Sequence, residues 1–199
     1  MKKSLVIASA NQGKIKEIKK ILKDIPFEMK SLIDLKIAIE VIESGKTFEE
    51  NAVLKAKTVG EKIKLLTLAE DSGLEVDALG GKPGIYSARY TGGSDQDRVE
   101  KLLKELKAIP REKRTARFYA CVCIYNPTEE ALSIFRGISK GYITEEPYGV
   151  NGFGYDPVFY NPKLGMTNAQ AALKEKNRVS HRAQALGKAR KYLLNHKYS

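Results

Sequence analysis

The stretch Ser-Leu-Val-Ile-Ala-Ser-Ala-Asn-Gln-Gly-Lys, residues 4–14, decides the fold class of this 199-residue chain. Residues 4–9 form a continuous apolar run, which is typical of a central strand buried on both faces. Asn11 follows and can cap a helix with its side chain. The apolar positions of that helix recur at helical spacing and are Ile15, Ile18, Leu22 and Ile25. A buried strand that leads directly into an amphipathic helix predicts an α/β protein.

A second helix is predicted to start near Thr47. Thr47 and Glu50 match a capping box, in which each side chain accepts a hydrogen bond from the other residue's backbone N–H. Its expected buried stripe is Ala52, Ala56, Val59 and Ile63. Asn51 and Lys55 lie four residues apart and therefore share a different face of the same helix.

The rest of the chain alternates between strand and helix patterns. Strands are expected at 66–70, 74–79, 115–125 and 131–136, and further helices at 96–107 and from about Val179. Glycine-rich loops are expected at 80–93 and 147–156. No repeat, linker or low-complexity segment divides the chain. We therefore predict a single domain over residues 1–199 with a mixed sheet.

Composition narrows the class of protein. The chain contains 35 Lys and Arg against 24 Asp and Glu, a formal net charge of +11. The excess lies in residues 1–30 and 161–199, whereas 31–160 carry a slight negative charge. Basic chain ends suit an anionic ligand, either a nucleic acid or a phosphate-rich small molecule, although a solvated lysine surface explains most of them. No apolar run approaches the roughly 20 residues that span a bilayer.

Two cysteines bear on the cellular compartment. Cys121 and Cys123 lie two residues apart in a strand pattern, which is the spacing of neither a zinc site nor a Cys-x-x-Cys redox pair. We expect two reduced core thiols in a cytoplasmic protein.

Several short segments carry residues suited to phosphate chemistry. Residues 9–14 place Lys14 at a helix start, where backbone N–H groups bind anions, but they lack the spacing of a Walker P-loop. Glu70-Asp71-Ser72-Gly73 follows a predicted strand, and oxygen ligands of this kind suit Mg²⁺. Adjacent strand residues point to opposite faces, so only one of the two carboxylates is expected to face a given metal unless the strand has ended.

Two further segments carry aromatic and basic residues. Residues 149–157 interleave three glycines with Phe153 and Tyr155, rings that are able to stack on a base. Residues 176–182 gather donors at the start of the last predicted helix. The adjacent Ser180 and His181 lack a third member and a nucleophile elbow, so a serine hydrolase is excluded.

Taken together and in this order, five segments resemble the inosine/xanthosine triphosphate pyrophosphatase family. The matching segments are SANQGK (9–14), GKTFEENAVLKA (45–56), LAEDSGLEVDALGGKPGIYSARY (68–90), GFGYDPVF (152–159) and EKNRVSHRAQAL (175–186). The resemblance implies an elongated mixed β-sheet flanked by helices, with two lobes around a central cleft. It also implies a Mg²⁺-dependent homodimer that hydrolyses ITP, dITP and XTP to the monophosphate and pyrophosphate. Neither a membrane nor a stable nucleic-acid complex is expected as a partner.

The same resemblance implies roles for individual residues. Asp71 is implied as the general base and a metal ligand, and Glu43 as a second metal ligand, with Glu40 as a nearby alternative. The implied polyphosphate-binding residues are Ser9, Ala10, Asn11, Gln12, Gly13, Lys14 and Lys55. Ser72 is implied as a further substrate contact. The implied base-reading residues are Phe153, Gly154, Tyr155, Asp156, Lys176, His181 and Arg182.

Two rival functions are considered. A Maf-type pyrophosphatase acts on modified pyrimidine nucleotides, but that family has a Ser-Pro-Arg-Arg opening where this chain has Ala-Asn-Gln-Gly-Lys. A basic nucleic-acid-binding module would explain the charge, yet the sequence contains no recognised nucleic-acid motif.

Overall fold

The computed structural model describes residues 3–196, which form seven strands, five α-helices and three short 3-10 helices. The strands are β1 (Lys3–Ile7), β2 (Phe27–Ser31), β3 (Thr67–Val76), β4 (Thr115–Asn126), β5 (Ala131–Ile143), β6 (Phe159–Asn161) and β7 (Met166–Thr167). The α-helices are α1 (Gln12–Ile21), α2 (Phe48–Ile63), α3 (Asp95–Glu105), α4 (Leu173–Val179) and α5 (His181–Asn195). The 3-10 helices are η1 (Asp77–Leu79), η2 (Gly84–Arg89) and η3 (Arg111–Lys113).

The strands form one mixed sheet in the order β2-β1-β3-β4-β5-β6-β7. Strand β1 pairs in parallel with both β2 and β3, whereas β6 pairs antiparallel with β5 and β7. The predicted α/β class with a mixed sheet and flanking helices is confirmed.

The chain divides into two compact units. The first unit runs to Asp71 and adds Ala120–Gly137 and the chain from Ala183 onward. The second unit consists of Ser72–Tyr119 and Ile138–Arg182. The expectation of one domain over residues 1–199 stays a prediction.

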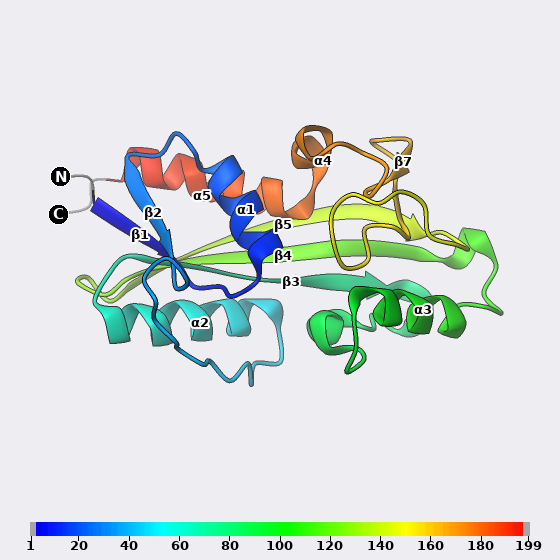
Figure 1. The fold of residues 1–199 in the computed structure, drawn as a ribbon, viewed down its shortest axis with the longest axis horizontal. Helices are drawn as coiled ribbons and strands as arrows, with labels where there is room; N and C mark the ends of the chain where they lie inside the picture. The colour runs from blue at the N-terminus through cyan, green and yellow to red at the C-terminus, as the bar shows by residue number, and fades with distance from the viewer. Residues whose placement is uncertain (1–2, 197–199) are drawn as a thin grey trace. The chain divides into compact units, whose positions relative to one another are not determined.

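The core of the first unit explains how its helices are held. Helices α1 and α5 lie on one side of its strands and α2 lies on the other (Figure 1). The predicted stripe of α1 is buried in this core, with Ile18 and Leu22 fully inaccessible. On α2, Ala52, Ala56 and Val59 are buried as predicted, and Ile63 is half-buried. Apolar burial on these faces stabilises the fold at about 25 cal/mol per Å².

The second unit has its own apolar core. Helix α3 contributes Val99 and Leu102 to it, and strand β3 contributes Leu74 and Val76. Ser94 caps α3, accepting a hydrogen bond from the backbone N–H of Asp97, while the Asp97 carboxylate accepts one from the Ser94 N–H. This reciprocal cap fixes where the helix begins.

The expected break between strands at 66–70 and 74–79 is wrong. A single strand, β3, runs through Glu70, Asp71, Ser72 and Gly73 without interruption. Ser-Gly is typical of a turn, but Gly73 is buried in the sheet, where pairing and packing outweigh local propensity. The two carboxylates therefore lie in the middle of a strand and not at its end.

Two helix predictions also need correction. The expected C-terminal helix from about Val179 is two helices, because Ser180 adopts an extended backbone with ψ of 153° between α4 and α5. The N-cap of α2 is confirmed, since Thr47 Oγ1 accepts a hydrogen bond from Glu50 N at 3.1 Å. The Glu50 carboxylate, however, accepts from Lys46 N at 2.7 Å, so the capping box closes one residue earlier than predicted.

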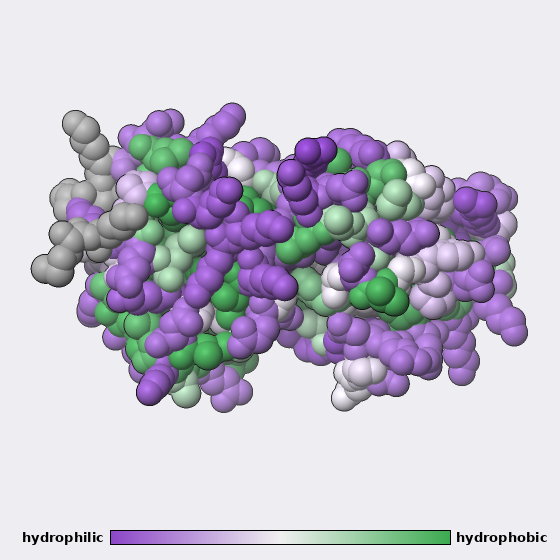
Figure 2. Space-filling view, turned by 45° about the horizontal axis from the view of Figure 1, so that its top comes forward, coloured by the Kyte–Doolittle hydropathy of each residue, from purple (hydrophilic) through white to green (hydrophobic). Residues whose placement is uncertain are grey.

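Hydrophilic side chains cover much of the face shown in Figure 2, with apolar groups scattered among them. Lysines such as Lys16, Lys20 and Lys23 on and just after α1 are accessible, as a solvated basic surface requires. A search of residues 3–196 finds no helix with the length and apolar character needed to cross a bilayer. Cys121 and Cys123 are both free thiols buried in the sheet, as predicted.

Candidate functional site

The first unit gathers four polar side chains that we call the carboxylate cluster: Glu43, Asn51, Lys55 and Asp71. Lys55 Nζ lies 2.9 Å from Glu43 Oε1 and 3.0 Å from Asp71 Oδ1. Asn51 Nδ2 donates to the other oxygen of Asp71 at 3.3 Å. Two acids distant in sequence therefore converge on one ammonium group.

Strand alternation explains why only Asp71 joins this cluster. Asp71 points toward α2, which carries Asn51 and Lys55 one turn apart. Its neighbour Glu70 instead contacts Lys14 of α1 at 3.8 Å, with its side chain inaccessible to solvent. The prediction that adjacent carboxylates face opposite sides of an unbroken strand is confirmed.

Lys55 is the cationic centre of the cluster. Burial by itself lowers the pKa of a lysine, but the charges of Asp71 and Glu43 and their hydrogen bonds outweigh burial and raise the pKa of Lys55. Lys55 is thus positively charged at neutral pH.

The donor set of the carboxylate cluster fits a hard divalent cation. Glu43 and Asp71 direct their carboxylate oxygens toward one position, which the Lys55 ammonium occupies in this structure. Mg²⁺ typically takes one or two protein carboxylates and completes its shell with phosphate oxygens and water. Within residues 3–196 no group of three or more His, Cys, Asp or Glu side chains is arranged around a metal position, so a nucleotide would have to supply further oxygens. Glu40 is exposed.

Residues 9–14 form the predicted strand-to-helix junction. Asn11 caps α1, its Oδ1 accepting from Lys14 N at 3.0 Å, and its own N–H donates to Ser9 Oγ at 3.2 Å. Ala10, Asn11 and Gln12 are exposed. A helix start of this kind, with Lys14 beside it, favours anion binding.

The second unit contains a group that we call the Phe153 cluster: Phe153, Asp156, Lys176 and Arg182. The Lys176 ammonium and the Arg182 guanidinium lie 5.2 and 5.5 Å from the centre of the Phe153 ring, within cation–π range. Lys176 Nζ also donates to Asp156 Oδ2 at 2.6 Å. The structure therefore brings three predicted base-reading residues together around the half-buried ring of a fourth, Phe153.

Asp156 organises the loop that carries Phe153. One oxygen accepts from Phe153 N at 3.0 Å and the other from Asn168 Nδ2 at 3.1 Å. Gly152 has φ of +79°, and a Cβ there would lie 2.2 Å from the Asp156 carboxylate, so this turn requires glycine. With its contact to Lys176, Asp156 is a buried acid with several partners, as a buried charge requires.

Two other predicted residues of this loop serve the core. Tyr155 is buried, and its hydroxyl donates to the backbone oxygen of Ser87 at 2.9 Å. Its ring is therefore not presented for stacking, and Phe153 is the aromatic of this loop that stays accessible. Gly154 N donates to Asp95 Oδ2 at 2.6 Å, which ties the loop to the start of α3.

The remaining predicted residues adjoin the Phe153 cluster. Arg182 donates from Nη2 to Ser72 Oγ at 3.2 Å, and Ser72 follows Asp71 directly along β3. The His181 ring stacks on Phe118 with ring centres 4.7 Å apart. His181 and Arg182 begin α5, and both are buried.

Sequence reasoning missed three positioning side chains. For Asn51 the spacing predicts only a face shared with Lys55, and its contact to Asp71 joins residues 20 positions apart. Asp95 and Asn168 hold the Phe153 loop through long-range contacts. Nothing local in the sequence marks those two, because their partners lie 59 and 12 residues away along the chain.

Comparison with known proteins identifies the family of this chain. The model of the Ham1 family matches residues 5–192. A dITP/XTP pyrophosphatase of Bacillus licheniformis is 47 % identical over 188 residues, covering 94 % of this chain and 95 % of the relative. The solved structure of the Staphylococcus aureus Ham1 protein superposes with a TM-score of 0.87 at 42 % identity, covering 98 % of this chain and all of that one.

A second solved structure shows the same likeness. The nucleoside-triphosphatase, or dITP/XTP pyrophosphatase, of Mycobacterium abscessus has a TM-score of 0.76 at 39 % identity, covering 94 % of this chain and 98 % of that one. Family match, sequence identity and fold agree over nearly the whole chain. This chain belongs to the Ham1 family.

Proposed function

We propose that this chain hydrolyses noncanonical purine nucleoside triphosphates, namely ITP, dITP and XTP, to the nucleoside monophosphate and pyrophosphate. The observation that carries the proposal is the carboxylate cluster, in which Glu43 and Asp71 both contact the Lys55 ammonium. Relatives at 47 % identity over nearly their full length bear the name dITP/XTP pyrophosphatase. The enzyme would remove such nucleotides from the precursor pool.

We propose Mg²⁺ as the cofactor, held by Asp71 and Glu43. Both acids contact Lys55, which supports them as the two ligands. Glu40 is exposed to solvent, so we prefer Glu43 as the second ligand. Held by Asp71 and Glu43, Mg²⁺ would supply charge neutralisation to the phosphate oxygens and Lewis acidity to the attacking water. Asp71 accepts the proton of the water that attacks the α-phosphorus. The bond from that phosphorus to the bridging oxygen breaks, and pyrophosphate leaves with the electron pair.

Residues of the first unit are proposed to hold the phosphates. The α1 start at residues 9–14 offers backbone donors, and Lys14 and Lys55 offer charge. As in phosphoryl transfer generally, the protein acts mainly by positioning and by stabilising charge. Lys55 would stabilise the phosphate charge most strongly if its ammonium group moved from a carboxylate to a phosphate oxygen.

The Phe153 cluster is proposed to select the base. Lys176 and Arg182 supply hydrogen-bond donors beside the accessible Phe153 ring. The Asp156 carboxylate accepts from Lys176. Hypoxanthine and xanthine have a 6-keto acceptor where adenine has a 6-amino donor. A site that donates to this position leaves ATP with donor facing donor, and sites of this kind discriminate by ~10⁴-fold or more.

Two properties follow from the family resemblance and remain proposals. We expect a homodimer, which light scattering would report as twice the chain mass of 22.2 kDa. We also expect a cytoplasmic location, because two free buried thiols suit a reducing compartment.

A pyrophosphate-release assay tests the proposed function. ITP, XTP, ATP and GTP are compared with Mg²⁺ and with EDTA, and a 5-methylated pyrimidine triphosphate is included as the Maf-type substrate. We expect release from ITP and XTP with Mg²⁺ and none with EDTA. Turnover of the pyrimidine nucleotide in preference to ITP would refute the assignment. Tight, salt-sensitive binding of RNA without any turnover would instead favour a nucleic-acid module.

A further inference from the structure

We propose that Asn51 is a positioning residue that joins the segment carrying Glu43 to the carboxylate of Asp71. The inference deepens the proposed function and rests on it, because that function assigns metal ligation to Glu43 and Asp71. Asn51 itself would touch neither metal nor substrate, since both ends of its carboxamide contact protein.

The contacts of Asn51 carry the inference. The residue lies in the first turn of α2 with no solvent exposure. Its Oδ1 accepts from Gly45 N at 2.9 Å, and its Nδ2 donates to Asp71 Oδ2 at 3.3 Å. Gly45 N–H is a donor, so the amide oxygen must face it and the NH₂ group must face Asp71. Aspartate lacks the donor and leucine lacks both groups, so only a carboxamide of this length satisfies the two neighbours.

The Gly45 side of the contact is close-packed. A Cβ on Gly45 would lie 2.6 Å from Asn51 Oδ1 and 2.7 Å from Glu50 Cβ. Lys46 N donates to Glu50 Oε2, which adds a second link between the segment and α2. Glu43 lies two residues before Gly45, so fixing Gly45 restricts where the Glu43 carboxylate lies.

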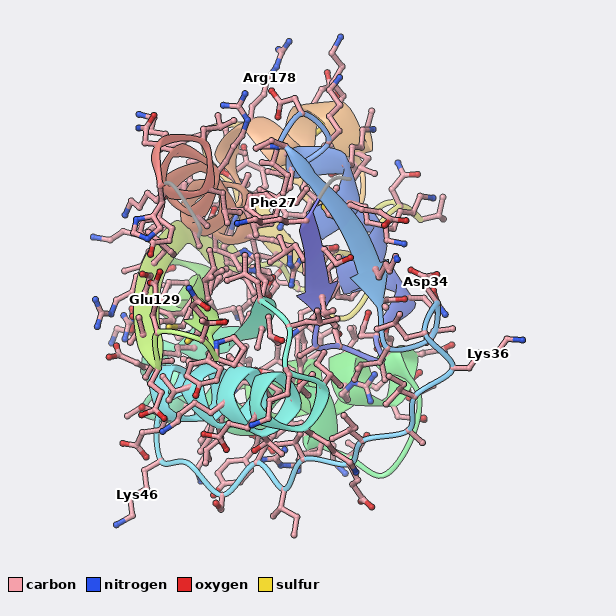
Figure 3. All side chains as sticks on the ribbon, turned by 90° about the vertical axis from the view of Figure 1, so that its left-hand side faces the viewer. Phe27, Asp34, Lys36, Lys46, Glu129 and Arg178 are labelled. Atoms are coloured by element: carbon pink, nitrogen blue, oxygen red, sulfur yellow. The ribbon has the colours of Figure 1, made fainter. Side chains whose placement is uncertain are left out.

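The segment before α2 runs along the outer side of that helix, as Figures 1 and 3 both show. Lys36 and Lys46 point outward into solvent in Figure 3. Glu43 is the residue of this segment that contacts Lys55. A long exposed segment needs a fixed attachment if it is to present one acid reproducibly, and Asn51 provides it.

The second reason concerns Lys55. Each Asp71 oxygen has its own donor, Lys55 on one and Asn51 on the other. When Lys55 turns to a phosphate, Asn51 stays with Asp71, because its carboxamide is buried on a short side chain. Partners that orient a metal ligand typically change metal affinity or activity by about 10–100-fold when they are removed.

The experiment compares Asn51→Ala and Asn51→Asp with Thr47→Ala as the matched control. Thr47 also stabilises the start of α2, through its cap on Glu50 N, but it lies outside the carboxylate cluster. Three quantities are measured: Mn²⁺ affinity by electron paramagnetic resonance in the presence of a non-hydrolysable ITP analogue, kcat and KM for ITP with Mg²⁺, and the melting temperature.

We expect Asn51→Ala to weaken Mn²⁺ binding and to lower kcat by about 10–100-fold each, with a smaller change in KM. Asn51→Asp keeps the acceptor for Gly45 N–H but loses the donor to Asp71. It should melt at a lower temperature, because two buried carboxylates then face each other, and it should lose at least about 10-fold in kcat below that temperature. Thr47→Ala should melt at a lower temperature and keep kcat and Mn²⁺ affinity within about 2-fold, because only the helix cap is lost.

Wild-type kcat in Asn51→Asp would overturn the inference, and so would an equal loss in Thr47→Ala, which would show that helix stability is the cause. Should Asn51→Ala fail to fold, the kcat of Asn51→Asp, measured below its melting temperature, decides the question. These results differ from a failure of the proposed function, in which the wild-type protein itself neither releases pyrophosphate from ITP nor binds Mn²⁺.

Discussion

The carboxylate cluster and the Phe153 cluster both pair a lysine with an acid, but they do so at different depths. Lys55 and Asp71 have side chains 13 % and 9 % exposed, whereas Lys176 and Asp156 are each 3 % exposed. Lys55 lies on α2 and Asp71 on β3, whereas Lys176 lies on α4 and Asp156 in a loop. Lys55 is thus the more accessible of the two lysines, and Lys176 is the more deeply buried.

This difference separates chemistry from recognition. An ammonium group that moves from a carboxylate to a phosphate must be reachable by the substrate. The Lys55 side chain is partly exposed, which suits this role. A loop that presents one ring needs a rigid support, and Asp156 supplies it through Lys176, Asn168 and the backbone of Phe153. Variants of the first cluster should therefore change turnover, and variants of the second should change stability and base selection.

Asp71→Asn should give the largest effect. Loss of the general base lowers rates by roughly 10²–10⁴-fold, and a metal ligand is lost as well. Pyrophosphate release from ITP measures this, together with the melting temperature, which should stay close to that of the wild type. A rate that survives intact would show that Asp71 is not the base.

Lys176→Met should mainly affect stability. Removing one partner of a buried ion pair leaves an uncompensated charge, here the Asp156 carboxylate, and costs about 3–5 kcal/mol. Urea unfolding followed by circular dichroism gives the free energy of unfolding. Lys57→Met is the control, because Lys57 forms an exposed pair with Glu61, and such pairs contribute about 0–1 kcal/mol.

Phe153→Ala should weaken the binding of every purine nucleotide to a similar degree. Stacking of a base on an aromatic ring contributes about 1–3 kcal/mol and tolerates any base. The KM values for ITP and ATP should rise together, and Phe153→Tyr should restore them. A change confined to ITP would mean that the ring selects the base and does not merely support it.

The smallest effect concerns the thiols. Burial raises the pKa of Cys121 and Cys123 to about 12. In the unfolded chain the same thiols ionise with a pKa of about 8.5. Their contribution to stability is complete below that value and declines as the pH rises toward 12. Labelling by iodoacetamide at about pH 8 should be slow in the native protein and fast in urea, because only the unfolded chain exposes and ionises the thiols. Equal rates would contradict the burial of these residues.

The sequence predicted regular elements better than their junctions. The α1 stripe and the Asn11 cap follow from local periodicity and capping, and both were confirmed. The continuous β3 and the break at Ser180 were not predicted, because sheet packing and tertiary contacts decide them. The Asp71–Lys55 contact could be anticipated only through the family resemblance. Asp95 could not, since its partner lies 59 residues away.

The central claim is that the two clusters perform separate tasks, and a single ratio tests it most directly: kcat/KM for ITP divided by kcat/KM for ATP. Lys55→Met should lower both values by a similar factor and leave the ratio unchanged. Arg182→Lys keeps the charge but loses the planar array of donors, so it should lower the ratio by about 10-fold or more, as the loss of one well-placed hydrogen bond does. An unchanged ratio in Arg182→Lys together with a collapsed ratio in Lys55→Met would contradict the account.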